Sequence, residues 1–255
     1  MKTNSQKLID VRQLKLQFGK KEVLKDVNFS LQPEEVLVIM GLSGCGKSTI
    51  LKIIMGLLKE SGGSVFFKDQ ELTKLSRPEL NQARTHIGMV YQNAALVSSM
   101  TVRDNLALPL KELTLKKDQE IDSVIDQKLE QVGLKDVKDL LPSELSGGMQ
   151  KRVGLARALM MEPELILFDE PSAGLDPVNS KLIDDLIIKL RDEQKVASIV
   201  VTHEMKSAFQ IASRIAFLHE GKVIFEGSSE DFQKSKDPTI HQFVSSYSEE
   251  KKQPE

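Results

Sequence analysis

The sequence lacks the features that mark secreted and membrane-spanning proteins. Among its 255 residues there is one cysteine, Cys45, so no internal disulfide can form and a reducing, cytoplasmic location is expected. The N-terminus does not have the basic and then apolar pattern of a signal peptide. The apolar runs at 36–40 and 165–168 are far shorter than the roughly 20 residues that a membrane-spanning helix needs. If the protein acts at a membrane, we therefore expect it to be recruited there.

The sequence also lacks an excess of charge of one sign. Lys and Arg number 35 against 37 Asp and Glu, which gives a formal net charge of -2. No global positive field is present to hold a polyanion through counterion release, so nucleic acid is not expected as a main partner. The length exceeds that of a typical single domain but fits one compact core with one inserted subdomain.

The first 60 residues predict strands followed by a helix. Apolar and polar residues alternate within segments 8–18 and 23–31, which flank a Gly-Lys-Lys turn. This pattern indicates an antiparallel ribbon. The continuous apolar run 36–40 predicts a strand buried on both faces, as in a parallel sheet. Segment 48–58 has apolar residues at helical spacing.

Between this strand and helix, residues 41–48 read GLSGCGKS and match the P-loop pattern. Glycines let successive backbone N–H groups turn inward around phosphate oxygens, and the helix adds the positive end of its dipole. We expect Lys47 to reach the β- and γ-phosphates and the Ser48 hydroxyl to bind Mg²⁺. The alternative, a glycine-rich turn with an incidental lysine, is disfavoured by the buried strand before it.

The rest of the chain predicts helices and then a return to strands. An apolar stripe over 121–132 indicates an amphipathic helix that stops at Gly133. Strands are predicted at 165–168 and 196–202 with a helix over about 180–191 between them, and a hairpin at 215–225. The polar segment 245–255 is expected to be loosely structured.

Two acidic residues follow the buried apolar run at 165–168, and they are the residue types that a nucleotide-hydrolysing site still needs. Asp169 stands where Mg²⁺ needs a carboxylate, and Glu170 stands where an attacking water needs a base. A strand that ends in Asp-Glu is weak evidence alone, because strand ends are often polar. After a P-loop, the pattern favours nucleotide hydrolysis.

A short glycine-containing motif separates one family from other P-loop proteins. Residues 145–150, LSGGMQ, followed by KRVGLARAL at 151–159, resemble the signature motif of ABC transporter ATPases and its helix. Ser146 can cap this helix, while Gly147 and Gly148 leave its N-terminus open to a close anion. An ordinary capped helix would need no such pair of glycines.

The resemblance covers residues about 8–245 and implies the remaining roles. Gln92, in MVYQ, matches the Q-loop glutamine that joins the γ-phosphate and Mg²⁺ to the helical subdomain, and Asp176 matches the D-loop. His203 matches the switch histidine, and Phe18 stands at the position of the adenine-stacking aromatic, where tyrosine is more usual. The expected ATP-binding residues are Phe18, Gly41, Ser43, Gly44, Cys45, Gly46, Lys47, Ser48 and Thr49, the expected Mg²⁺ ligands are Ser48, Gln92 and Asp169, and the catalytic residues are Glu170, His203 and Gln92.

The fold that this resemblance implies is an α/β P-loop NTPase with a RecA-like parallel sheet, an N-terminal antiparallel β subdomain and an inserted α-helical subdomain. Residues 1–245 would form one ATPase domain, with 1–92 and 163–235 as the catalytic core, 93–162 as the helical subdomain and 236–255 as a tail. Two copies would close head to tail on ATP, with Ser146, Gly147 and Gly148 of one copy contacting the nucleotide of the other. Hydrolysis would then drive a separate membrane permease from the cytoplasmic face of the inner membrane.

The transported substrate is indicated by finer similarities. Stretches 84–110 and 141–152, and the ending DPTIHQF at 237–243, are similar to ATPases of the bacterial Mla/MCE lipid-transport systems. Most solute importers carry Gln where Met149 stands here, although an amino-acid or other small-solute importer stays open as the alternative. The same resemblance implies a lipid-binding MCE-type protein and a small regulatory subunit as further partners. A soluble ABC ATPase acting on DNA or ribosomes is disfavoured, because 93–162 is too short for a long coiled coil and the chain carries one cassette.

Overall fold

The computed structural model describes residues 7–250, with side chains described for 7–245, and divides into two compact units. The second unit is Lys74–Val200, and the described residues before and after it form the first. Strand β8 (Ala197–Thr202) contains the second boundary, since Val200 and Val201 belong to different units. No helix in the described part of the chain is long and apolar enough to cross a bilayer.

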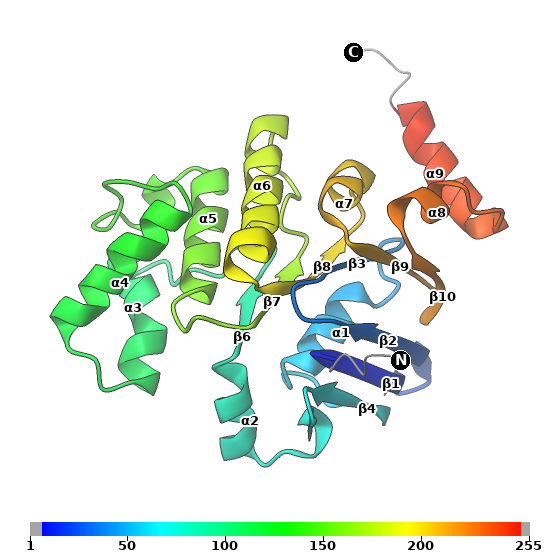
Figure 1. The fold of residues 1–255 in the computed structure, drawn as a ribbon, viewed down its shortest axis with the longest axis horizontal. Helices are drawn as coiled ribbons and strands as arrows, with labels where there is room; N and C mark the ends of the chain where they lie inside the picture. Colours follow the sequence, from blue (N-terminus) through cyan, green and yellow to red (C-terminus); the bar gives the residue numbers. More distant parts are fainter. Residues whose placement is uncertain (1–6, 251–255) are drawn as a thin grey trace, which may run out of the picture. The chain divides into compact units, whose positions relative to one another are not determined.

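The N-terminal part of the first unit is a four-stranded antiparallel sheet in the order β2-β1-β4-β5, of which Figure 1 labels β1, β2 and β4. The predicted ribbon is confirmed, with Ile9 opposite Leu31 and Phe18 opposite Lys21. One face of β1 is apolar and buried, which gives the alternation that the sequence predicted. The strands are β1 (Ile9–Phe18), β2 (Lys21–Leu31), β4 (Gly62–Phe67) and β5 (Gln70–Glu71).

The rest of the first unit is an α/β core in which strands lie in the order β10-β9-β3. All five residues of β3 (Val36–Met40) are buried, as predicted, and β3 pairs with β9 in parallel. The predicted hairpin is β9 and β10, which pair antiparallel. The remaining elements are α1 (Lys47–Ile54), α7 (Met205–Ile211), β9 (Arg214–His219), β10 (Lys222–Gly227), α8 (Ser229–Gln233) and α9 (Pro238–Glu250).

The helix α1 ends earlier than the sequence predicted. Its last residue is Ile54, and Gly56 then takes the left-handed conformation with φ of 62°. The Leu57 N–H donates to the Lys52 carbonyl at 2.8 Å, which closes the helix end with a glycine-containing cap. Glycine conformation therefore overrides the apolar spacing that continues to Leu58.

The expectation of a loose segment over 245–255 is wrong for its first part, because α9 continues through Glu250. The carboxylate of Asp237 accepts from the Thr239 N–H at 2.8 Å and so caps the start of α9. Within the helix, the Ser245 hydroxyl donates to the His241 carbonyl at 2.7 Å, so a polar residue is accommodated without breaking the helix. Residues 251–255 lie outside the described part of the chain.

The second unit combines a parallel pair of strands with helices (Figure 1). Strands β6 and β7 pair in parallel from Ile87 opposite Leu165 to Val90 opposite Phe168. The predicted amphipathic helices are present, and Gly133 follows α4 with φ of 68°. The elements are η1 (Leu72–Lys74), which crosses into this unit, α2 (Arg77–Arg84), β6 (Ile87–Val90), α3 (Val102–Leu113), α4 (Asp118–Gln131), η2 (Pro142–Glu144), α5 (Gly147–Ala158), β7 (Leu165–Asp169) and α6 (Pro177–Gln194).

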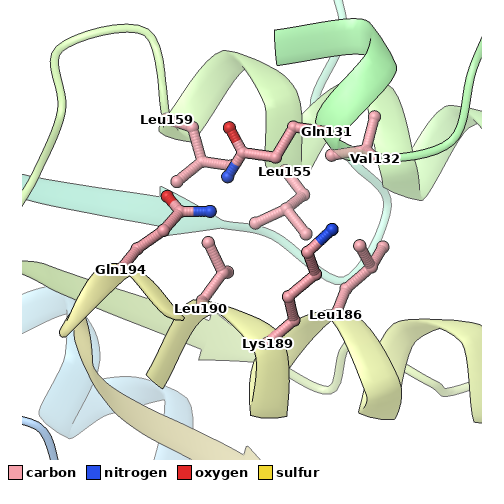
Figure 2. Close-up of a pocket in the computed structure, with 8 residues that line it drawn as sticks. All are labelled: Gln131, Val132, Leu155, Leu159, Leu186, Lys189, Leu190 and Gln194. Atoms are coloured by element: carbon pink, nitrogen blue, oxygen red, sulfur yellow. The ribbon is translucent and has the colours of Figure 1, made fainter. Parts of the chain in front are cut away.

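A small pocket lies where α4, α5 and α6 approach one another (Figure 2). Five of its eight lining residues are aliphatic, and the amide of Gln131 lies among them; the five are Val132, Leu155, Leu159, Leu186 and Leu190. The Gln131 Nε2 atom is buried and has no hydrogen-bond partner. A buried amide nitrogen without a partner is unfavourable, so an aliphatic replacement of Gln131 tests how these helices pack.

Candidate active site

The P-loop occupies the turn between β3 and α1 in the first unit. Its three glycines, Gly41, Gly44 and Gly46, have φ of 153°, 78° and 108°, where L side chains are strained. A Cβ on Gly41 would also lie 2.3 Å from the carbonyl oxygen of Leu218. A Cβ on Gly46 would lie 2.8 Å from Cδ2 of Leu24. Both backbone conformation and close packing therefore require glycine in this loop.

The lysine of the P-loop is buried against the same loop. The Lys47 ammonium donates to the carbonyl of Gly41 at 2.8 Å and to that of Leu42 at 3.2 Å. Its charge therefore lies beside the start of α1, where backbone N–H groups and the helix dipole favour an anion. Of the other predicted contacts, Ser43 is exposed, whereas Cys45, Ser48 and Thr49 are half-buried.

Two more predicted residues belong to the first unit. Phe18 is the last residue of β1, and its side chain is 54% exposed. An aromatic ring this exposed is available for stacking on a planar ligand. His203 follows β8 directly and is also exposed.

The acidic pair stands at the end of β7 in the second unit. Asp169 is the last residue of the strand, and both Asp169 and Glu170 are buried, at 8% and 9% exposure. The Glu170 backbone has φ of 50°, a left-handed conformation that costs a non-glycine residue about 1–3 kcal/mol. Strain of this kind persists only where the surroundings fix the residue, so the direction of the Glu170 side chain is set by its turn.

A lysine that the sequence interpretation missed contacts this turn. Lys151 of α5 is buried, and its ammonium donates to the Ala173 carbonyl at 2.5 Å, with the Glu170 carbonyl at 3.5 Å. The available signal was helical spacing, since Lys151 shares the buried face of α5 with Gly148 and Leu155. A lysine on a buried helix face needs partners, and here backbone carbonyls supply them.

The signature motif forms the capped helix start that the sequence predicted. Ser146 is the N-cap of α5, and its hydroxyl accepts from the Met149 N–H at 3.3 Å. Gly147 is exposed, whereas Gly148 is buried against Asn179 of α6. The second glycine is therefore required by contacts within the chain as well as suited to an approaching anion.

The predicted D-loop residue has a structural role of its own. The Asp176 carboxylate caps α6 by accepting from the backbone N–H groups of Val178 and Asn179 at 2.9 and 3.0 Å, and from the Asn179 side chain at 2.5 Å. The Asn179 side chain first, and these backbone groups with it, lower the pKa of Asp176.

The predicted Q-loop glutamine begins a loop that α5 holds in place. Gln92 is exposed, and the following Ala94 and Ala95 have φ of 56° and 49°. The Arg157 guanidinium donates to the carbonyl of Ala95 at 2.7 Å and to that of Ala94 at 2.9 Å. The buried Asn105 side chain binds the other end of this loop through the backbone of Val97 at 2.7 and 3.1 Å. Two side chains thus stabilise a strained connection.

The comparisons with known proteins agree with this arrangement. Residues 24–173 match the family model described as ABC transporter. The chain is 41% identical to the chloroplastic protein TRIGALACTOSYLDIACYLGLYCEROL 3 of Arabidopsis thaliana over 96% of this chain and 75% of that one. It is 38% identical to the intermembrane phospholipid transport system ATP-binding protein MlaF of Haemophilus influenzae, over 94% of this chain and 91% of MlaF.

A solved structure gives the same assignment. The dimeric ATP-binding cassette MJ0796, in a post-hydrolysis state with ADP and Pi, superposes with a TM-score of 0.80 at 32% identity, covering 87% of this chain and 98% of that one. The predicted α/β P-loop fold, with its antiparallel β subdomain and parallel sheet, is thereby confirmed. The chain belongs to the ABC transporter family, as one of its ATP-binding and ATP-hydrolysing subunits.

Proposed function

We propose that this chain hydrolyses ATP to energise lipid transport by a separate membrane permease. The observation that carries the lipid assignment is the similarity to MlaF, whose name specifies intermembrane phospholipid transport, over 94% of this chain. Its similarity to a chloroplast protein named for a galactolipid supports the same substrate class.

The site residues supply the chemistry that hydrolysis needs. Lys47 and the P-loop backbone bind the β- and γ-phosphates, with Ser43, Gly44, Cys45, Gly46 and Thr49 around them and Phe18 against adenine. Glu170 orients the attacking water, and His203 contacts the γ-phosphate. Electrostatic stabilisation by these fixed groups is the main catalytic effect in phosphoryl transfer.

The donor atoms fit Mg²⁺. Ser48, Gln92 and Asp169 offer hydroxyl, amide and carboxylate oxygens, and hard oxygen ligands are those that Mg²⁺ takes, together with substrate phosphates. Among the described residues no three His, Cys, Asp or Glu side chains gather as a cation site. We infer that nucleotide phosphates supply further oxygen ligands, as is usual for Mg²⁺.

The working form proposed is a dimer closed on ATP. The similar cassette MJ0796 is dimeric. Ser146, Gly147 and Gly148 of one copy bind the γ-phosphate held by the other, and the Asp176 loop crosses between the copies. Loss of the γ-phosphate removes the charge that keeps the dimer closed.

The proposed partners are integral membrane permease subunits, an MCE-type lipid-binding protein and a small regulatory subunit, at the cytoplasmic face of the inner membrane. We keep residues 93–162 as the proposed helical subdomain. The exposed loop after Gln92 is its proposed contact with the permease. We likewise keep 1–92 and 163–235 as the proposed catalytic core and 236–255 as the proposed tail.

The experiment that tests the lipid assignment uses Ser146→Arg in cells. A bulky cation at the start of α5 prevents closure while the P-loop of the same chain is untouched, so transport stops. We expect a strain carrying this variant to be as sensitive to detergent or bile salt as a deletion, while it grows normally on media limited for single nutrients. Ser123→Arg, at an exposed position of α4, is the matched control and keeps resistance. Normal detergent resistance with failure on one amino acid or ion would overturn the lipid assignment in favour of a solute importer.

A further inference from the structure

Helix α5 carries three cationic side chains that bind backbone carbonyls of three different segments. The Arg157 guanidinium contacts the loop at Ala94 and Ala95. The Arg152 guanidinium contacts the end of α4 through the Gly133 carbonyl at 3.0 Å. Lys151, which is 7% exposed, contacts the turn that begins at Glu170.

This turn is short and tightly defined. It joins β7 to the segment before α6, and the Ala173 N–H donates back to the Glu170 carbonyl at 3.3 Å. The Lys151 ammonium lies at both ends of it, 2.5 Å from the Ala173 carbonyl oxygen and 3.5 Å from that of Glu170. One buried charge therefore fixes the backbone on which the Glu170 side chain stands.

The geometry explains why the strained conformation of Glu170 persists. A φ of 50° at a glutamate is unfavourable by itself, so contacts around the turn must maintain it. A buried ammonium is costly unless it is hydrogen-bonded, and Lys151 meets that need by bonding to this turn. The lysine and the strained turn thus stabilise one another.

We propose that Lys151 is a positioning residue that holds Glu170 in register with the signature helix. The proposal rests on the proposed role of Glu170 in hydrolysis. Helix α5 begins directly after Ser146, which contacts the ATP held by the other copy in the proposed dimer. Lys151 connects this helix to Glu170, the base that acts on the ATP held by its own copy. Lys151 itself does not touch ATP or the attacking water.

The test is Lys151→Met, which keeps most of the unbranched apolar stem of the side chain and removes its charged donor. We expect kcat for ATP hydrolysis to fall about 10- to 100-fold, since small displacements of a catalytic group have effects of this size. The Kd for ATP should stay within about twofold, because the P-loop is unchanged. In a Glu170→Gln background the Lys151→Met change should still allow the ATP-bound dimer, so the loss lies in the hydrolytic step.

Two further variants separate positioning from general stability. Arg152→Met removes the neighbouring cation of α5, whose carbonyl partners lie away from Glu170, and it should keep kcat near that of the parent even where thermal stability falls. Lys151→Arg keeps a charged donor and should recover most of the rate. If Lys151→Met does not fold, Lys151→Gln, with a shorter neutral donor, is measured for the same split between kcat and Kd.

A folded Lys151→Met or Lys151→Gln variant with kcat within about twofold of the parent would overturn the proposal. Equal losses of kcat in Lys151→Met and Arg152→Met, in proportion to lost stability, would also overturn it. A wrong role for Glu170 would give a different result, because the Glu170→Gln variant would then hydrolyse ATP at the parent rate.

Discussion

The Asn179 side chain occupies the space beside Gly148 of the signature motif. A Cβ on Gly148 would lie 2.6 Å from the Oδ1 atom of Asn179 and 2.8 Å from its Cγ atom. Asn179 cannot easily withdraw, because its amide donates to Asp176 at 2.5 Å and its backbone N–H is bonded to the same carboxylate. The second glycine of the motif is therefore also a packing requirement between α5 and α6.

Gly148→Ala should destabilise the folded chain by about 1–3 kcal/mol, because the added methyl overpacks this contact. Gly147→Ala is the matched control, since its Cβ would meet nothing closer than Leu175 Cδ2 at 4.0 Å. Urea unfolding of both variants measures the difference. The cost of Gly148→Ala should largely vanish in an Asn179→Ala background, and equal costs with and without that change would contradict the contact.

Replacing Gln131 by Leu should stabilise the fold by about 1 kcal/mol, because its buried amide nitrogen has no partner and the surrounding lining is mainly aliphatic (Figure 2). Gln194 lines the same pocket but is exposed, so Gln194→Leu should bring no comparable gain. Thermal unfolding of the two variants gives the comparison. A lower midpoint for Gln131→Leu than for the parent would show that the amide is satisfied in solution.

A bulky thiol reagent should block ATP binding by labelling Cys45, the sole cysteine of the chain. Cys45 is half-buried, and its Sγ atom would lie 2.9 Å from a Cβ on Gly41, so an adduct has to enter the phosphate-binding loop. Prior Mg-ATP should protect the thiol. Cys45→Ser, which has no thiol to label, should bind ATP with or without reagent. Normal ATP hydrolysis by fully labelled protein would mean that the loop containing Cys45 is not the phosphate-binding site.

Features that depend on residues close together in the chain could be predicted from the sequence. The apolar run of β3, the glycines after it and the cap at Ser146 each depend on residues adjacent in the chain, and the structure has them as predicted. The P-loop and signature motif then identified the family by resemblance. Positions that depend on distant partners were not found, since the contact of Lys151 with the Ala173 carbonyl joins residues 22 apart.

Element ends were the other weak point, for a physical reason. Apolar spacing runs on past Ile54 although Gly56 closes α1, and polar composition after Ser245 suggests no structure although α9 continues. Caps decide such ends, and a cap is visible in sequence only when its glycine or acidic residue is given more weight than the pattern around it.

Two copies of the chain are proposed to close on ATP, after which Glu170 supplies the base for hydrolysis. Glu170→Gln keeps the shape and hydrogen-bonding capacity of the side chain while removing the base, so ATP binding should survive and turnover should stop. Lys47→Ala is the control, since it should lose ATP binding and stay monomeric.

Size-exclusion chromatography of Glu170→Gln with Mg-ATP, run beside an ATPase assay, is the most direct measurement. We expect a shift to twice the monomer mass that depends on ATP, together with hydrolysis below a few per cent of the parent rate. A Glu170→Gln protein that stays monomeric with bound ATP would rule out closure on ATP, and one that hydrolyses ATP near the parent rate would rule out Glu170 as the base.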